Sequence, residues 1–101
     1  MTRQITKQAV KAFMQGENFK LSNTEVKANC KEIKMYLFGN CIAERVGERI
    51  RVTLAGYNTN TTRERLNGIP NCKISQKNFI PYLNGKEINS NEWYPLYEIE
   101  V

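Results

Sequence analysis

The side chains with the clearest chemistry in this chain cluster in one short stretch. Two hydroxyls and two guanidinium groups lie close together there, contributed by Thr61, Thr62, Arg63 and Arg65. All four donate hydrogen bonds, and the first turn of a helix would add free backbone N–H groups and the positive end of the helix dipole. The stretch therefore predicts a surface that binds an anion, or a partner that carries phosphate or carboxylate groups. The alternative is a connecting helix whose arginines are merely solvated.

Local signals indicate a short helix over residues 61–68. Thr61 is a suitable N-cap, and Glu64 three residues later completes the pattern of a capping box. Gly68 and Pro70 then stop the helix after about two turns. The helix would place the donors of the predicted anion site in and next to its first turn.

The two arginines of this helix cannot serve one site together. Residues two apart on a helix point in nearly opposite directions, so only one guanidinium group can face the anion beside the helix N-terminus. We expect Arg63, in the first turn, to take this role. Arg65 is then expected to pack along the domain surface or to pair with a glutamate.

Basic charge is concentrated in the first two thirds of the chain. The formal net charge is +5, and residues 1–65 hold twelve of the fifteen Lys and Arg residues. This surplus favours an acidic partner such as nucleic acid, although it also serves solubility. Basic residues alternate with aromatic ones in the expected strands and predict a secondary basic surface, made of Lys34, Arg45, Arg49 and Arg51. The neighbouring Tyr36 and Phe38 would either stack on bases or belong to the core.

Missing residue types narrow the chemistry further. The chain has no histidine, and all ten acidic residues are glutamates. The commonest general base, the imidazole metal ligand and the aspartate of most phosphoryl-transfer sites are therefore absent. We expect no catalytic residues, no metal site, no cofactor and no enzymatic activity. The three cysteines, Cys30, Cys41 and Cys72, form no C-x-x-C pair and are expected to be reduced core residues.

Length and apolar periodicity predict a single α+β domain over residues 1–101. An amphipathic helix over residues 1–16 ends at Gly16 and is expected to pack on an antiparallel sheet. No apolar run approaches the roughly 20 residues that span a bilayer, and the N-terminus lacks the apolar core of a signal peptide. We therefore expect a cytoplasmic protein without a membrane partner.

The remaining apolar pattern predicts β-structure on both sides of the short helix. Residues 19–56 predict a β-meander, with a weak strand at residues 19–28 followed by three alternating strands. Residues 72–101 predict a C-terminal hairpin and a terminal strand. The hairpin turns at Asn84-Gly85, because this dipeptide readily adopts the positive φ angles of a type I′ turn.

Two expected turns, Gly39-Asn40 and Gly47-Glu48, fix the register of the meander. In this register Tyr36 opposes Ala43, and apolar residues occur on both faces of the sheet. One helix covers one face only. The other face then needs a second cover, which is either the C-terminal third of the chain or a second copy of the protein, and this predicts a homodimer.

A combination of short motifs resembles a known group of sequences. In chain order the motifs are Asn23-Thr24-Glu25-Val26, Leu37-Phe38-Gly39-Asn40 with Ile42-Ala43, Ala55-Gly56-Tyr57, Thr61-Thr62-Arg63-Glu64-Arg65-Leu66-Asn67-Gly68-Ile69-Pro70 and Tyr82-Leu83-Asn84-Gly85-Lys86. They are similar to motifs of small uncharacterised proteins encoded by tailed bacteriophages and prophages, over about residues 23–93. The N-terminal helix lies outside this similarity. The resemblance carries no assigned activity, and it implies a small accessory protein that binds a host component.

These observations favour a non-catalytic phage protein that binds a host protein or a component of anti-phage defence in the host cytoplasm. The alternative is a basic module that binds nucleic acid or nucleotide phosphates. The second reading predicts an affinity that falls steeply with salt, because phosphate contacts release counterions.

Overall fold

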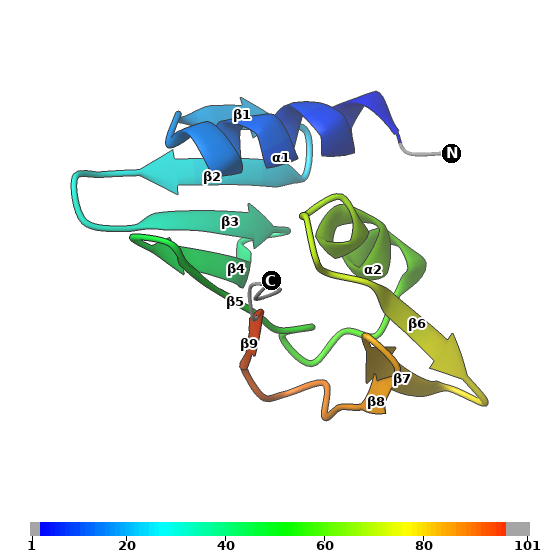
Figure 1. Ribbon diagram of the computed structural model, residues 1–101. Coiled ribbons are helices and arrows are strands. Elements are labelled where there is room, and N and C mark those ends of the chain that lie inside the picture. Colours follow the sequence, from blue (N-terminus) through cyan, green and yellow to red (C-terminus); the bar gives the residue numbers. More distant parts are fainter. Residues whose placement is uncertain (1–2, 97–101) are drawn as a thin grey trace.

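The computed structural model describes residues 3–96 and has an α+β fold (Figure 1). The elements, in chain order, are α1 (Gln4–Gln15), β1 (Phe19–Leu21), β2 (Thr24–Ala28), β3 (Ile33–Leu37), β4 (Asn40–Val46), β5 (Arg49–Val52), α2 (Asn60–Asn67), β6 (Ile74–Lys77), β7 (Ile80–Leu83), β8 (Lys86–Glu87) and β9 (Tyr94–Leu96). The strands form a six-stranded antiparallel sheet in the order β1-β2-β3-β4-β5-β9 and a three-stranded antiparallel sheet in the order β6-β7-β8. The predicted α+β class is confirmed.

Helix α1 covers one face of the larger sheet and packs on β1, β2 and β3 (Figure 1). Its buried side chains include Ala9, Ala12 and Phe13. Gly16 ends the helix as expected, in the left-handed conformation with φ 75°, and its N–H donates to the Ala12 carbonyl. The helix therefore has an apolar side on the sheet and a polar side that faces away from it.

The weak strand expected over residues 19–28 is in fact two strands. Strands β1 and β2 form a hairpin in which Phe19 opposes Val26. Ser22 and Asn23 form the turn, and Ser22 has a φ of 55°. Serine and asparagine favour turns because their side chains bond to nearby backbone groups.

The turn between β3 and β4 lies one residue earlier than expected. Phe38 and Gly39 occupy it with φ angles of 51° and 80°, and Leu37 opposes Asn40 across it. The expected Gly39-Asn40 turn is therefore wrong. Two consecutive left-handed residues suit the twist of a hairpin, but the first of these positions normally prefers asparagine, aspartate or glycine over phenylalanine.

A β-bulge at Ile42 resets the register of the meander. Tyr36 opposes Cys41 whereas Met35 opposes Ala43, so Ile42 is the extra residue of β4. The expected pairing of Tyr36 with Ala43 is therefore wrong. The bulge lets two consecutive residues point into the core, where Ile42 is 1% exposed and Ala43 is fully buried.

The hairpin between β4 and β5 has the expected turn at Gly47-Glu48 and the expected pairing of Ala43 with Val52. Together with the bulge, it aligns Val26, Met35, Ala43 and Val52 in one buried row across four strands. Apolar residues are thus gathered on the face that α1 covers, and the opposite face is largely charged. The open face carries fewer apolar residues than expected, among them Tyr36, Cys41 and Val46, and the homodimer stays a prediction.

The C-terminal third supplies the second sheet and one more strand of the first. Asn84 and Gly85, with φ angles of 51° and 87°, form the expected turn between β7 and β8. Strand β7 is central in its sheet despite Pro81, whose carbonyl accepts a hydrogen bond from the Ile88 N–H at 3.0 Å, at the point where β8 ends. Strand β9 pairs with β5, and the rest of the expected terminal strand, residues 97–101, lies outside the described residues.

Helix α2 begins earlier than expected because Thr59 is its N-cap. Thr59 has an extended backbone, with φ −110° and ψ 160°, and its Oγ1 accepts a hydrogen bond from the Thr62 N–H at 3.2 Å. Thr61 lies inside the helix, so the expected cap at Thr61 and its capping box with Glu64 are wrong. The same type of residue caps the helix, two positions upstream.

Gly68 follows α2 for a reason that local signals do not give. Its backbone is right-handed, with φ −75°, so the position needs no glycine for its conformation. A Cβ atom there would lie 2.8 Å from side-chain carbons of Thr6 and Val10. Glycine therefore allows the end of α2 to approach α1 closely.

The two threonines allow a direct test of the cap. Thr59→Ala should lower the free energy of unfolding by about 1 kcal/mol, because the Thr62 N–H loses its acceptor. Thr61→Ala should change it by less than about 0.5 kcal/mol. Urea denaturation followed by circular dichroism measures both, and an equal loss in the two variants would contradict the assignment of Thr59.

Candidate functional site

Arg65, one of the residues of the predicted anion site, is buried inside the molecule. Arg65 is only 1% exposed to solvent. The Nε–H donates to Thr24 Oγ1 at 3.0 Å and the Nη1 group donates to Thr6 Oγ1 at 2.7 Å. It also forms an ion pair with Glu64. Arg65 therefore joins α2 to α1 and β2, in agreement with the expectation that it packs and pairs with a glutamate.

Glu64 completes this network from the other side. Its carboxylate accepts hydrogen bonds from the Arg3 N–H at 2.9 Å and from the Thr6 hydroxyl at 2.8 Å. Burial alone would raise the pKa of Glu64, but these two hydrogen bonds and the charge of Arg65 outweigh it, and the pKa lies below the ordinary value of 4.5. Glu64 thus holds the first turn of α1 against α2.

Arg63, expected to face the anion, is also largely buried, at 8% exposed. Its guanidinium group donates to the Asn58 carbonyl at 3.1 Å and to Gln76 Oε1 at 3.3 Å, and it also bonds to the side chains of Asn58 and Asn60. These acceptors come from the start of α2, the loop before it and strand β6. Arg63 therefore connects α2 to the second sheet.

The four residues of the predicted anion site are not gathered on one surface. Thr62 is buried and its hydroxyl lies 2.9 Å from that of Thr59, while Thr61 is half-buried. The donors of Arg63 and Arg65 are directed at protein acceptors. Anion binding at this helix stays a prediction, and the contacts of the two arginines are structural.

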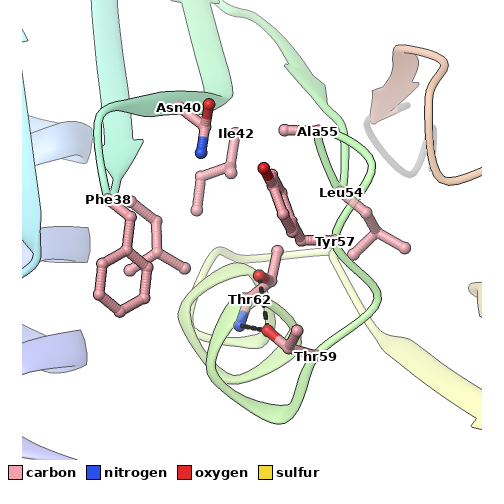
Figure 2. A pocket seen from close by; sticks show the side chains of 9 residues that line it. Phe38, Asn40, Ile42, Leu54, Ala55, Tyr57, Thr59 and Thr62 are labelled. Atoms are coloured by element: carbon pink, nitrogen blue, oxygen red, sulfur yellow. Dashed lines mark hydrogen bonds between the residues drawn. The ribbon is translucent and has the colours of Figure 1, made fainter.

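A pocket of about 310 Å³ opens beside the first turn of α2 (Figure 2). It lies between the β3–β4 turn, the loop that follows β5 and the N-terminus of α2. Its lining is Leu37, Phe38, Asn40, Ile42, Leu54, Ala55, Tyr57, Thr59 and Thr62. The floor is apolar and consists of Leu37, Ile42 and Leu54, which are almost fully buried. The polar groups of the lining are one amide, one phenol and two threonine hydroxyls.

Two exposed aromatic side chains flank this pocket. Phe38 is 70% exposed and Tyr57 is 55% exposed. Figure 2 shows the two rings on either side of Ile42. Large apolar side chains at a concave, largely apolar surface are typical of ligand pockets and of interface anchors.

The loop that carries Tyr57 is fixed at both ends of its turn. Ala55 and Gly56 have φ angles of 53° and 82°, and the Tyr57 N–H donates to the Leu54 carbonyl at 2.8 Å. The Gly56 N–H donates to the Ser90 carbonyl at 2.7 Å. The phenol ring is therefore displayed from a hydrogen-bonded turn.

The tip of the β6–β7 hairpin carries a third exposed aromatic, Phe79, which is 87% exposed and has a φ of 66°. The side-chain amide of Asn58, next to Tyr57 in the chain, donates to the Phe79 carbonyl at 3.2 Å and to Gln76 Oε1 at 3.3 Å. The guanidinium group of Arg63 donates a hydrogen bond to the Asn58 carbonyl and so fixes the position of Asn58. This network ties the hairpin tip to the loop that lines the pocket.

The four residues of the predicted secondary basic surface divide between the two faces of the larger sheet. Lys34, Arg49 and Arg51 lie on the face opposite α1. Arg45 lies on the covered side, where it donates to the Gly47 carbonyl at 2.9 Å and to the Met14 carbonyl at the end of α1. Arg45 therefore serves the helix C-terminus, whose free carbonyls favour a cation.

The cysteines occupy different environments. Cys72 is buried, and burial raises the pKa of its thiol to about 12. Cys41 is half-buried and Cys30 is exposed, so only Cys72 follows the expectation of core residues. Within residues 3–96, no three His, Cys, Asp or Glu side chains are grouped so that they could hold a metal ion.

Comparison with known protein families decides what this chain is related to. Residues 2–100 match the family model described as Kyanoviridae Gp96 protein. The chain belongs to this family. The Gp96 family is a family of phage proteins, which confirms the phage part of the resemblance, and the match includes the N-terminal helix that the motif similarity had left out.

Other comparisons add no relative to this Gp96-family chain. No curated protein and no solved structure matches it. Among the described residues, neither helix is long and apolar enough to cross a membrane.

Sequence reasoning found the α2 stretch but missed the pocket next to it. Phe38 was expected either to stack on a base or to belong to the core, and Tyr57 was part of a motif without a role. The signal that could have pointed to the pocket is the Phe38-Gly39 pair. Phenylalanine is unfavourable before glycine in a tight hairpin turn, so its presence there indicates another use of the ring. The remaining lining comes together only through the bulge at Ile42 and the packing of α2.

The buried network predicts that Arg65 matters for stability. Arg65→Ala should lower the free energy of unfolding by about 3 kcal/mol, because it leaves Glu64 without its cation and the Thr6 and Thr24 hydroxyls without a donor. Arg49→Ala, at an exposed position, should change it by less than about 0.5 kcal/mol. Urea denaturation measures both, and a mild effect of Arg65→Ala would show that the network is not needed.

Glu64 should make stability depend on pH. Its pKa is lower in the folded than in the unfolded chain, so its contribution is complete above 4.5 and is lost as the pH falls through the folded value. Wild type should therefore be more stable than Glu64→Gln at neutral pH, and the difference should shrink in acid. Thermal melts from pH 7 to pH 3 would follow it. A difference that stays constant over this range would contradict the assignment.

Proposed function

We propose that this Gp96-family protein is a non-catalytic binding module that engages a protein of the host or of its anti-phage defence in the host cytoplasm. The pocket flanked by Phe38 and Tyr57 is the proposed contact site. The observation that carries the proposal is Phe38 itself, a large apolar side chain that is 70% exposed at the edge of an apolar pocket.

The backbone at Phe38 does not explain the choice of phenylalanine. The Asn84-Gly85 turn has nearly the same φ angles, 51° and 87°, as the Phe38-Gly39 turn, 51° and 80°. Asn84 uses its side chain locally, accepting from the Lys73 N–H at 2.9 Å and donating to the Asn71 carbonyl at 2.9 Å. Phe38 makes no such contact and bears a cost of about 1 kcal/mol for its left-handed conformation. A function of the exposed ring would account for that cost.

The shape and chemistry of the pocket fit one apolar side chain of a protein partner. About 310 Å³ accommodates a single large aliphatic or aromatic group, which Leu37, Ile42 and Leu54 would contact from below. Asn40 and Tyr57 would supply hydrogen bonds for the polar backbone around such a side chain. Aromatic residues around a desolvated pocket are the usual energetic centre of a protein interface.

The lining also supports a role without catalysis. Apart from the phenol of Tyr57, the residues around the pocket have no acidic, basic or thiol side chain. General acid–base or nucleophilic chemistry normally needs such a group close to the substrate. Binding alone needs the apolar floor and the two rings, which are present.

Phe38→Asn separates binding from folding. Asparagine suits the first position of this turn, so the variant should gain about 1 kcal/mol of stability while it loses the exposed ring. Affinity capture from host lysate with the wild type, quantified by mass spectrometry, identifies the partner. Phe38→Asn should recover it at least tenfold less efficiently.

Leu21→Asn is the matched control for this experiment. Leu21 is 48% exposed on β1, away from the pocket, so its loss should leave recovery of the partner unchanged. Direct titration of the purified partner then gives the affinities. Equal binding by wild type and Phe38→Asn, with both folded, would rule out the pocket as the contact site.

A further inference from the structure

The face of the larger sheet opposite α1 carries a row of charged residues across four strands. The registers align Lys27 of β2, Lys34 of β3, Glu44 of β4 and Arg51 of β5. Three steps between neighbouring strands separate Lys27 from Arg51, a span of about 14 Å. This face contains none of the residues that line the pocket flanked by Phe38 and Tyr57.

The row is not arranged for the best internal pairing of charge. Lys27 and Lys34 lie directly opposite each other, and like charges in this position destabilise a sheet. Lys34 has an ion pair with Glu32 at 3.4 Å, and Arg51 pairs with Glu44, whereas Lys27 has no ion pair within residues 3–96. The repulsion between two adjacent lysines is relieved when an anion binds between them.

Two aromatic rings accompany the cations of this row. The Lys27 Nζ lies 5.3 Å from the centre of the Tyr36 ring, and the guanidinium carbon of Arg51 lies 5.2 Å from the centre of the Trp93 ring. Both rings are half-buried, so each is held in place and still accessible. Cations paired with aromatic rings on an open sheet are the combination that single-stranded nucleic acids require, because phosphates and unpaired bases alternate along the strand.

The surrounding charge has the matching sign. The cations of this face and its edge are Lys20, Lys27, Lys34, Arg49 and Arg51, and the carboxylates are Glu25, Glu32 and Glu44. The surplus is positive. A duplex would offer phosphates but hide the faces of its bases, and so would leave the two rings unused.

We infer that this face binds single-stranded nucleic acid, with phosphates at Lys27 and Lys34 and bases stacked on Tyr36 and Trp93. The inference is independent of the proposed protein partner, because the two surfaces share no residue. Binding should weaken steeply with salt, since each phosphate contact releases a counterion.

The chain has a single tryptophan, so the fluorescence of Trp93 reports directly on stacking. We expect unlabelled oligo(dT) of about 12 nucleotides to quench this fluorescence. The apparent affinity should fall as sodium chloride is raised. Oligo(dT) that leaves the fluorescence unchanged at low salt would overturn the inference.

Charge reversal in matched pairs tests the position of the site. Lys27→Glu combined with Lys34→Glu should weaken binding of labelled oligo(dT) at least tenfold in fluorescence anisotropy. Lys7→Glu combined with Lys11→Glu makes the same change of net charge on the exposed side of α1 and should weaken it by less than threefold. Equal losses in the two double variants would mean that net charge alone drives binding, and would overturn the site.

Substitutions of Tyr36 test the proposed stacking of bases on the aromatic rings. Tyr36→Phe keeps a stacking face and should retain binding of oligo(dT), whereas Tyr36→Leu should lose at least fivefold in affinity. Circular dichroism confirms that both variants fold.

Inorganic polyphosphate and duplex DNA of the same charge should compete poorly with oligo(dT) and leave Trp93 fluorescence unchanged. Competition by polyphosphate equal to that by oligo(dT) would overturn base stacking.

Discussion

The buried guanidinium group of Arg65 is the interaction on which the arrangement of the molecule depends. It is the largest side chain in the core, and its hydrogen bonds reach Thr6 on α1 and Thr24 on β2. A cation in this position is tolerated only because Glu64 and the two hydroxyls satisfy it. The contact sets where α2 lies on the sheet, and the N-terminus of α2 in turn closes one side of the pocket through Thr59 and Thr62. The position of the proposed binding site is therefore a consequence of a polar contact in the core.

The extra residue of β4 has consequences on both faces of the larger sheet. The bulge turns Ile42 and Ala43 inward together, and this places Ile42 in the pocket floor. It also brings Glu44 opposite Lys34, so that Glu44 lies on the open face in one row with Lys34 and Arg51. One inserted residue thus contributes to an apolar pocket on one side and to the row of charged residues on the other.

Local signals in the sequence were sufficient for much of the fold. The amphipathic pattern and Gly16 gave the first helix, and the Asn84-Gly85 and Gly47-Glu48 turns gave two hairpins, because each depends on neighbouring residues alone. The bulge at Ile42 was out of reach, since it satisfies two buried positions that strict alternation assigns to opposite faces. The burial of Arg63 and Arg65 was equally hidden, because it depends on contacts with segments distant in the chain, at Gln76 for Arg63 and at Thr6 and Thr24 for Arg65. The pocket depends on these same long-range contacts, which explains why its position could not be predicted.

The two proposed surfaces differ in the physical origin of their affinity. The pocket is lined by uncharged residues, so association there rests on apolar burial and is little affected by moderate salt. The opposite face gains affinity from exposed cations, whose attraction salt screens strongly. A partner bound at the pocket should therefore remain bound at an ionic strength that releases a nucleic acid from the sheet. The pocket is closed by α2, whereas the basic face is formed by β2–β5. A substitution in one surface therefore need not alter the other. A small domain built in this way has room for both contacts at once.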